Sequence, residues 1–218
     1  MPVTMDGTFD GALDLSHLHP EVVLADMQTT GIAAVIYKAT EGTTFQDPFY
    51  ERRRYEANAL GLLWGAYHFS SGAAPADQVN NFLNTIQWGV DSDSDAATLL
   101  ALDFETSTSG PDMSVEDACT FVSLVQQRTG RWPMVYGSNL VTNADAVADP
   151  ACPLSNCPLW YASYNNQPLH VPSRVWTRGW TLWQFSDGRL GPAPTNGLDR
   201  SCYLGTQAAL QQAWPSFA

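Results

Sequence analysis

Short apolar segments alternate with longer helical patterns over most of the chain, and this alternation restricts the possible folds more than any other feature. The apolar runs predicted as buried strands are residues 32–37, 62–67, 98–105, 133–136 and 159–162. Helices are predicted between them at 49–60, 76–88 and 114–129, and a further short helix is expected before residue 159. Alternation of this kind predicts parallel strands in a sheet whose faces are covered by helices.

The pattern changes in the last part of the chain. Residues 180–185 and 198–203 are predicted as strands, and Gly- and Pro-rich turns join them without a helix. We therefore predict an α/β fold, a modified TIM-like barrel in which about five β/α units are followed by strands that lack helices. No repeat, low-complexity tract or linker divides the sequence, so residues 1–218 are predicted to form a single domain.

The charge of the chain limits its partners. Its 22 acidic and 10 basic residues give a formal net charge of −12, which argues against a nucleic-acid surface. No apolar run approaches the ~20 residues that a membrane-spanning helix needs, so no membrane association is expected. Residues 1–14 lack the basic and apolar regions of a signal peptide, so an exported protein would have lost one or used another route.

Four cysteines, at positions 119, 152, 157 and 202, indicate an oxidising compartment and two disulfides. Three pairings are possible, and we favour Cys152 with Cys157 and Cys119 with Cys202. Four buried free thiols are the alternative. Cys119 is expected to be helical and structural rather than a nucleophile.

Asp103 and Glu105 lie at the carboxyl end of an otherwise apolar predicted strand, which is where parallel barrels place their chemistry. Residues i and i+2 of a strand share a face, with Cα atoms roughly 6–7 Å apart. Two acids held together in a partly dry barrel mouth do not both ionise easily, so one of them can serve as a general acid. The alternative is that Asp103 caps the loop and Glu105 is solvated.

Other polar and aromatic residues fall at similar positions. Asp14 ends a short first strand, and Asp199 lies in the last one, although each could be an ordinary turn acid. Aromatic rings pack against sugar rings, and amides bind their hydroxyl or acetamide groups. The candidates at strand ends are Tyr67, Tyr136, Trp160, Tyr164, Trp183 and Gln184, with polar neighbours His68 and Asn165 that favour a groove over a plain core.

Other kinds of site have weaker support. His17 and His19 form an HxH pair without a convincing third ligand, so no metal site is predicted. The sequence has no phosphate-binding glycine loop, dinucleotide fingerprint or serine nucleophile elbow, so no cofactor is expected.

Seven blocks in chain order resemble glycoside hydrolase family 25, the Chalaropsis-type lysozymes. They are LDLS at 13–16, KATEG at 38–42 with Asp47-Pro48, GAYHF at 65–69, LDFE at 102–105, LWYASY at 159–164, LWQ at 182–184 and GLD at 197–199. The resemblance extends from about residue 10 to about residue 205. It implies a modified barrel and an N-acetylmuramidase that cleaves the β-1,4 bond between N-acetylmuramic acid and N-acetylglucosamine in bacterial peptidoglycan. We also expect the protein to be secreted and monomeric.

The same resemblance implies roles for single residues. Glu105 matches the proton donor of the family, Asp103 its partner, and Asp14 and Asp199 the other acids of the mouth. Tyr67, Tyr136, Trp160 and Gln184 fall at positions expected in the groove, beside the candidate Tyr164.

The reaction route follows from where the acids lie. Asp103 is on the same strand as Glu105, so it is badly placed to attack the sugar from the opposite face. We expect it to orient the 2-acetamido group of the substrate as an internal nucleophile, which would retain the anomeric configuration. An inverting route with Asp14 or Asp199 as base is the alternative. A non-catalytic wall-binding module and a chitin-cleaving enzyme are the competing functions.

Overall fold

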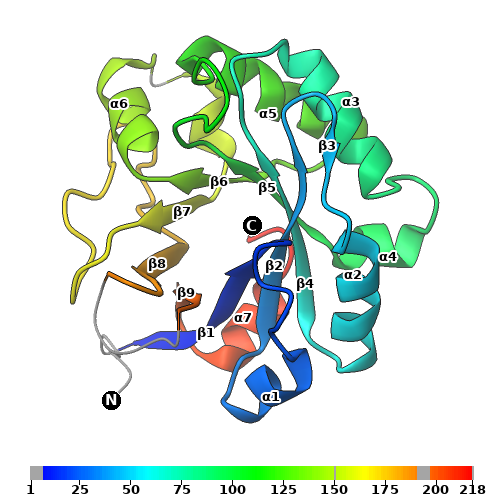
Figure 1. Ribbon diagram of the computed structural model, residues 1–218. Helices are drawn as coiled ribbons and strands as arrows, with labels where there is room; N and C mark the ends of the chain where they lie inside the picture. Colours follow the sequence, from blue (N-terminus) through cyan, green and yellow to red (C-terminus); the bar gives the residue numbers. More distant parts are fainter. Residues whose placement is uncertain (1–6, 150, 191–196, 218) are drawn as a thin grey trace.

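The computed structural model describes residues 7–149, 151–190 and 197–217, and its strands close into a barrel (Figure 1). The strands are β1 (Thr8–Leu15), β2 (Ala34–Glu41), β3 (Phe45–Gln46), β4 (Leu63–Phe69), β5 (Leu99–Asp103), β6 (Met134–Gly137), β7 (Leu159–Ala162), β8 (Leu182–Asp187) and β9 (Asp199–Leu204). Their order is β1-β9-β8-β7-β6-β5-β4-β2-β3, and a further pairing of β1 with β2 closes the ring. The short β3 only extends the edge of β2.

Parallel pairing runs from β1 through β2, β4, β5, β6 and β7 to β8. The last strand, β9, is antiparallel to both of its neighbours, β8 and β1. The turn between β8 and β9 carries no helix among the described residues, and this is why the last strand reverses its direction. The prediction of a modified barrel with five β/α units followed by strands lacking helices is confirmed.

Helices surround the barrel (Figure 1). They are α1 (Leu24–Thr29), α2 (Tyr50–Ala59), α3 (Pro75–Thr85), α4 (Ser92–Ala97), α5 (Val115–Thr129), α6 (Asn139–Val147), the 3₁₀-helix η1 (Pro153–Asn156) and α7 (Gln207–Ala213). Helix α5 has the predicted start and stop, because Ser114 caps its amino end and Gly130 adopts the left-handed conformation at its carboxyl end. No helix in the described ranges is both long and apolar enough to cross a bilayer.

Alternating side chains on each strand divide the core into two layers. On β8, Trp183 and Phe185 belong to the cluster outside the barrel, whereas Leu182 belongs to the cluster inside it. Trp183 is fully buried, so the expectation that it lies at a groove is wrong. His68 on β4 is fully buried, and its ring stacks on Phe121 of α5 at 5.1 Å. His68 is therefore part of the layer between sheet and helices, and the expectation that it is a wet neighbour of a groove is wrong.

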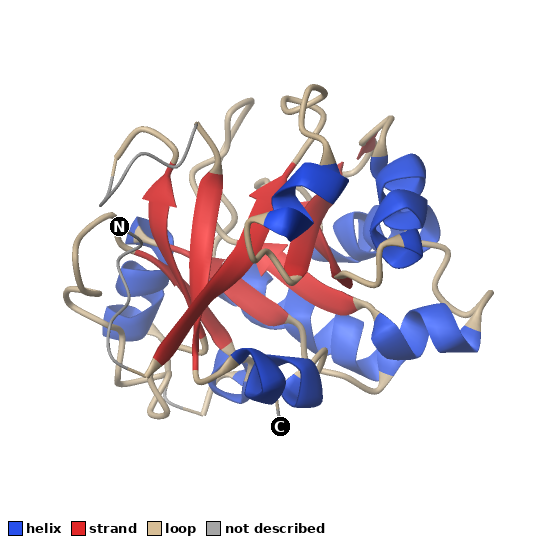
Figure 2. Cartoon of the chain, turned by 90° about the horizontal axis from the view of Figure 1, so that it is seen from below, coloured by secondary structure: helices blue, strands red, loops and turns tan. Residues whose placement is uncertain are grey.

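The carboxyl-terminal segment fills the end of the barrel at which the parallel strands begin (Figure 2). Leu210 of α7 packs with Ala12 and Ala34, and Trp214 and Phe217 pack against the same cluster. The indole of Trp214 donates hydrogen bonds to the carbonyl of Trp64, near the start of β4, and to that of Ala97, two residues before β5, both over 3.1 Å. This end of the barrel interior is thus closed by protein, so the opposite end is left for a site.

One disulfide joins Cys119 on α5 to Cys152 beside η1, with Cα atoms 6.4 Å apart. Cys157 and Cys202 are buried free thiols. The predicted pairing is wrong, because α5 packs directly against η1 whereas Cys202 lies on β9, which is separated from β5 by three strands of the sheet. A disulfide requires Cα atoms within about 7 Å, so helix packing rather than sequence spacing selects the partner.

Candidate active site

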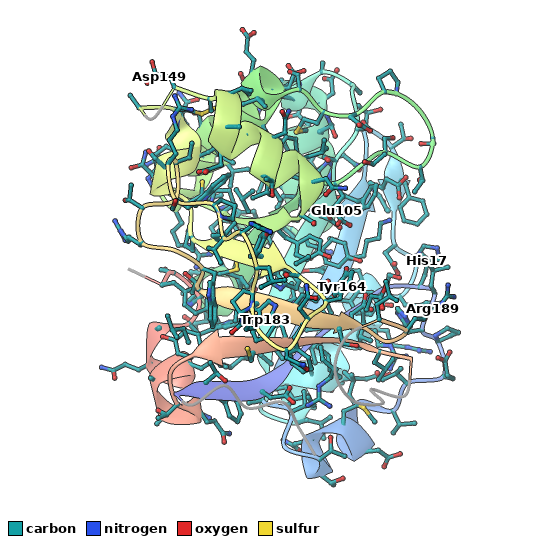
Figure 3. The ribbon with its side chains drawn as sticks, turned by 90° about the vertical axis from the view of Figure 1, so that its left-hand side faces the viewer. His17, Glu105, Asp149, Tyr164, Trp183 and Arg189 are labelled. Atoms are coloured by element: carbon teal, nitrogen blue, oxygen red, sulfur yellow. A yellow bond between two sulfur atoms is a disulfide. The ribbon has the colours of Figure 1, made fainter. Side chains whose placement is uncertain are left out.

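Acidic side chains from four strand ends line one cavity of about 410 Å³ at the carboxyl ends of the parallel strands. These acids are Asp14, Glu41, Asp103, Glu105 and Asp199. Figure 3 shows Glu105, Tyr164 and His17 on the side of the barrel away from α7. All four predicted acids therefore lie in one cavity, although they come from three separate parts of the chain.

Asp103 is the last residue of β5, and Glu105 follows two residues later. Phe104 between them is 1% exposed and packs outward against the helices, so the alternation of a strand continues past its end. Burial, followed by the charge of Asp199, raises the pKa of Glu105 to about 7. Burial and then the charge of Glu105 raise the pKa of Asp103 well above its usual range, while Lys38 opposes that rise.

Asp14 on β1 and Asp199 on β9 are paired directly opposite each other in the antiparallel register. Burial and the charge of Asp199 raise the pKa of Asp14 well above its usual range. The pKa of Asp199 is also raised by burial, and a hydrogen bond from Asp14 opposes that rise. Burial therefore raises the pKa of both carboxyl groups, and that of Asp14 further than that of Asp199.

Gln184 on β8 lies beneath the cavity, 1% exposed, and connects three of the predicted residues. Its Oε1 accepts hydrogen bonds from the hydroxyls of Tyr136 at 2.7 Å and Tyr164 at 2.9 Å. Its Nε2 donates to Oδ2 of Asp14 at 2.9 Å. Because the two hydroxyls and the carboxyl group demand opposite ends of the amide, the orientation of Gln184 is fixed.

The aromatic candidates divide into those at the surface of the cavity and those below it. Tyr67 and Tyr136 line the cavity, and Tyr164 is half-buried beside Gln184. Trp160 is 2% exposed, lies 4.5 Å from Tyr136 between ring centroids, and donates from its indole to Ser201 at 2.9 Å. Trp160 thus supports the ring of Tyr136 from the barrel interior.

Lys38 and Glu41 lie at the site but were not predicted to be functional residues. The ammonium of Lys38 contacts Oε2 of Glu41 at 2.5 Å and lies 4.6 Å from the ring centroid of Phe69. Lys38 is only 9% exposed. A lysine within an otherwise apolar strand was the available signal, because an ammonium is rarely buried without a partner.

His17 also lines the cavity, and its Nδ1 lies 3.0 Å from Oδ2 of Asp47, which is fully buried. The other histidine of the HxH pair, His19, uses its Nδ1 to accept a hydrogen bond from the backbone of Ser16 at 3.3 Å. Within the described part of the chain, no three His, Cys, Asp or Glu side chains are arranged as a metal site. Both histidines therefore have structural partners of their own.

Comparisons with known proteins agree with this arrangement. Residues 13–191 match the family model described as glycosyl hydrolases family 25. Lysozyme M1 of Streptomyces globisporus is 30% identical over 217 residues, covering 91% of this chain and 69% of that protein. The N,O-diacetylmuramidase of a Chalaropsis species is 31% identical over 199 residues, covering 80% of this chain and 86% of that protein. The solved structure of a muramidase from Trichobolus zukalii superposes with a TM-score of 0.75 at 27% identity, covering 95% of this chain and 99% of that one.

Proposed function

This chain belongs to family 25 of the glycosyl hydrolases and hydrolyses peptidoglycan as a muramidase, and we propose that Glu105 is its general acid. The observation that carries this proposal is the pKa of Glu105, raised to about 7 in a cavity lined by other acids. A carboxyl group with that pKa keeps its proton in a large fraction of molecules near neutral pH. Glu105 donates this proton to the glycosidic oxygen as the bond from that oxygen to C1 of N-acetylmuramic acid breaks.

Asp103 orients the 2-acetamido group of the same sugar, whose carbonyl oxygen attacks C1. Two observations support this role. Oδ1 of Asp103 is buried and accepts no hydrogen bond from any described residue, so the acetamide N–H would supply the missing donor. Burial and Glu105 raise the pKa of Asp103, with Lys38 opposing the rise, and the carbonyl oxygen of a carboxyl group accepts this hydrogen bond even when the group is protonated.

Asp199 assists the second step, in which water attacks C1 and the carboxylate of Glu105 takes a proton from it. Asp199 is half-buried and lines the cavity, whereas Asp14 is 8% exposed and bonded to Gln184. Asp14 is therefore a positioning residue, bonded to Gln184 and paired in register with Asp199. An inverting route would use Asp199 as the base that activates water, and the stereochemistry of the product distinguishes the two routes.

Tyr67, Tyr136 and Tyr164 form the wall on which the sugar rings lie. Tyr67 and Tyr136 line the cavity directly, and Tyr164 is held beside them through Gln184. Trp160 and Gln184 act from below, because both are almost fully buried. Their contribution is to hold the tyrosines in place.

The enzyme acts as an extracellular monomer that works without a cofactor. The Cys119–Cys152 disulfide supports an oxidising compartment, and the peptidoglycan substrate lies outside the cytoplasm. The molar mass of the purified protein, measured by light scattering, tests whether it is a monomer.

Nuclear magnetic resonance of freshly cleaved, soluble peptidoglycan oligomers tests the route of the reaction. Attack by the acetamide followed by water predicts that the β-anomer of the new reducing end appears first. An α-anomer as the first product would contradict the role of the acetamide.

A second arm tests Asp103 itself. Asp103→Ala should lower kcat on N-acetylated oligomers by about 10²- to 10³-fold, the size of a lost transition-state hydrogen bond. It should lower the already slow cleavage of chemically N-deacetylated oligomers far less. Asp77→Ala, a change at an exposed acid on α3, is the matched control and should change neither rate.

A further inference from the structure

A second cavity, of about 480 Å³, lies at the opposite end of the barrel from Glu105. It is lined by three loop segments at residues 130–132, 155–159 and 176–181, and by Ser216 and Phe217 after α7. The first segment precedes β6, the second leads into β7 and the third leads into β8, so the cavity is at the amino ends of these parallel strands. In Figure 2 this is the end that carries α7 and the C-terminus. Its volume is within the range of small-ligand sites.

Two tryptophans give this cavity an aromatic lining. Trp132 is half-buried, and Trp176 is 3% exposed. The indole Nε1–H of Trp176 is buried and has no acceptor among the described residues. An indole N–H can only donate, and buried donors are almost always paired, so Trp176 leaves one donor unsatisfied in the wall of this cavity.

The charges of the lining point to the same kind of ligand. Arg178 is exposed on the loop that carries Trp176, and it forms no ion pair or hydrogen bond with any described residue. Arg131 also lines the cavity, but its guanidinium donates to the carbonyls of Asp95 at 2.7 Å and Thr98 at 3.0 Å. No carboxylate is present among the described lining residues, in contrast to the acidic cavity around Glu105.

Unpaired donors beside aromatic rings select a ligand that offers oxygen acceptors and an apolar ring face. N-acetylated sugars have both, because the C–H face of the ring packs on an aromatic side chain and the acetamide carbonyl accepts hydrogen bonds. We propose that this cavity is a second, non-catalytic saccharide site that binds an N-acetylated segment of wall glycan. Holding one strand there raises the effective concentration of neighbouring strands at the active site of an enzyme that acts on an insoluble polymer.

The carboxylate of a muramyl sugar and the acetamide of a neutral sugar are two sources of the same acceptor oxygen. The test uses the Glu105→Gln protein, so that neither saccharide is cleaved. The indole N–H resonances are followed while either N,N′,N″-triacetylchitotriose or N-acetylmuramic acid is added. The Trp176 signal is assigned with Trp176→Phe, and it is expected to shift with at least one of the two saccharides.

Arg178→Ala and Trp132→Ala should each weaken this binding at least tenfold, the scale of a lost anchor contact. Arg52→Ala, which removes a 56% exposed arginine on α2, should leave it unchanged. With Glu105 intact, Arg178→Ala should cleave soluble oligomers at the normal rate and insoluble sacculi several-fold more slowly. Because Arg178 is exposed, this variant is expected to fold even if the tryptophan variants do not.

A Trp176 signal that stays fixed with both saccharides would overturn the proposal, as would equal binding by Arg178→Ala and the parent protein. A shift with the chitotriose alone identifies the acetamide as the recognised group, and a shift with N-acetylmuramic acid alone identifies the carboxylate. Neither result depends on the route of cleavage, because binding is measured in a protein without the catalytic acid.

Discussion

Gln184 on β8 donates a hydrogen bond to Asp14 on β1 across the barrel interior, over 2.9 Å between Nε2 and Oδ2. These two strands are not neighbours, because β9 lies between them. The same amide accepts from Tyr136 and Tyr164, so one buried side chain joins the acidic pair Asp14–Asp199 to the aromatic wall of the cavity. A substitution of Gln184 is therefore expected to remove hydrogen bonds from Asp14, Tyr136 and Tyr164 at the same time.

Gln184→Met keeps most of the volume of the side chain but leaves two hydroxyls and one carboxyl group without their partner. We expect a loss of about 2 to 4 kcal/mol in the free energy of unfolding, since each unsatisfied buried group costs about 1–3 kcal/mol and part of the loss relaxes. Urea denaturation measures it. Ser201→Ala, which removes only the partner of Trp160, is the matched control and should cost less. Equal losses in the two variants would show that Gln184 does not link several groups.

The pH dependence of kcat should have a basic limb near pH 7, because turnover requires protonated Glu105 and its pKa is raised to about 7. Activity therefore falls as the pH rises through that value. Asp199→Asn should move the limb to lower pH, since the charge of Asp199 contributes to the raised pKa of Glu105. Rates on soluble oligomers between pH 4 and 9 measure both, with Asp77→Asn as a variant that should not move the limb. A flat profile through pH 8.5 would exclude Glu105 as the acid.

The buried His68 is expected to make the folded protein less stable in acid. Burial lowers its pKa from 6.5 to about 4, and its two ring nitrogens are bonded to Thr40 at 2.8 Å and Gln78 at 3.0 Å. The unfolded chain binds a proton below pH 6.5 and the folded chain does not, so stability is complete above that pH and is lost as the pH falls toward 4.

We expect this group to account for roughly 1–3 kcal/mol between pH 7 and pH 4. Thermal unfolding over this range measures it. His68→Gln should flatten the dependence, whereas His170→Asn, a change at an exposed histidine, should not. If both variants keep the parent slope, then another group causes the loss in acid.

The fold was largely predictable from sequence, because buried parallel strands and amphipathic helices leave different apolar periods. Helix α4 left no such period, since none of its residues is buried and its start is fixed only by the Asp91 cap. The disulfide was not predictable either. Cys119 meets Cys152 because α5 packs against η1, and this contact depends on helix packing that no spacing of cysteines encodes.

The acidic residues of the site could be predicted from the sequence, but most of the contacts that hold them could not. Asp103 and Glu105 follow an apolar strand, and their alternation with buried Phe104 could be expected from the strand period. The pairing of Asp14 with Asp199 could not, because it depends on the antiparallel register of β9. The position of His17 at the cavity could not be predicted either, because its ring is held by Asp47, which is 30 residues away in sequence.

Reduction of the single disulfide should destabilise the protein measurably. Cys119 and Cys152 are separated by 33 residues, and closing a loop of that size is worth about 3–4 kcal/mol in the chain-entropy account. Cys119→Ala should therefore lower the midpoint of urea unfolding. When the parent protein is unfolded without reductant and alkylated, mass spectrometry should find the label on Cys157 and Cys202. A peptide joining Cys152 to Cys157 would contradict this pairing.

Glu105→Gln tests the central claim most directly, because the amide keeps the size of the side chain but has no proton to donate. The measurement is the release of reducing ends from purified peptidoglycan, with mass analysis after borohydride reduction to identify the terminal sugar. We predict that the wild type produces terminal muramitol and that the variant, with an unchanged unfolding midpoint at pH 5, releases ends about 10²–10⁴-fold more slowly. Turnover by the variant within a few-fold of wild type, or terminal glucosaminitol from the wild type, would contradict the assignment of Glu105 as the general acid of a muramidase.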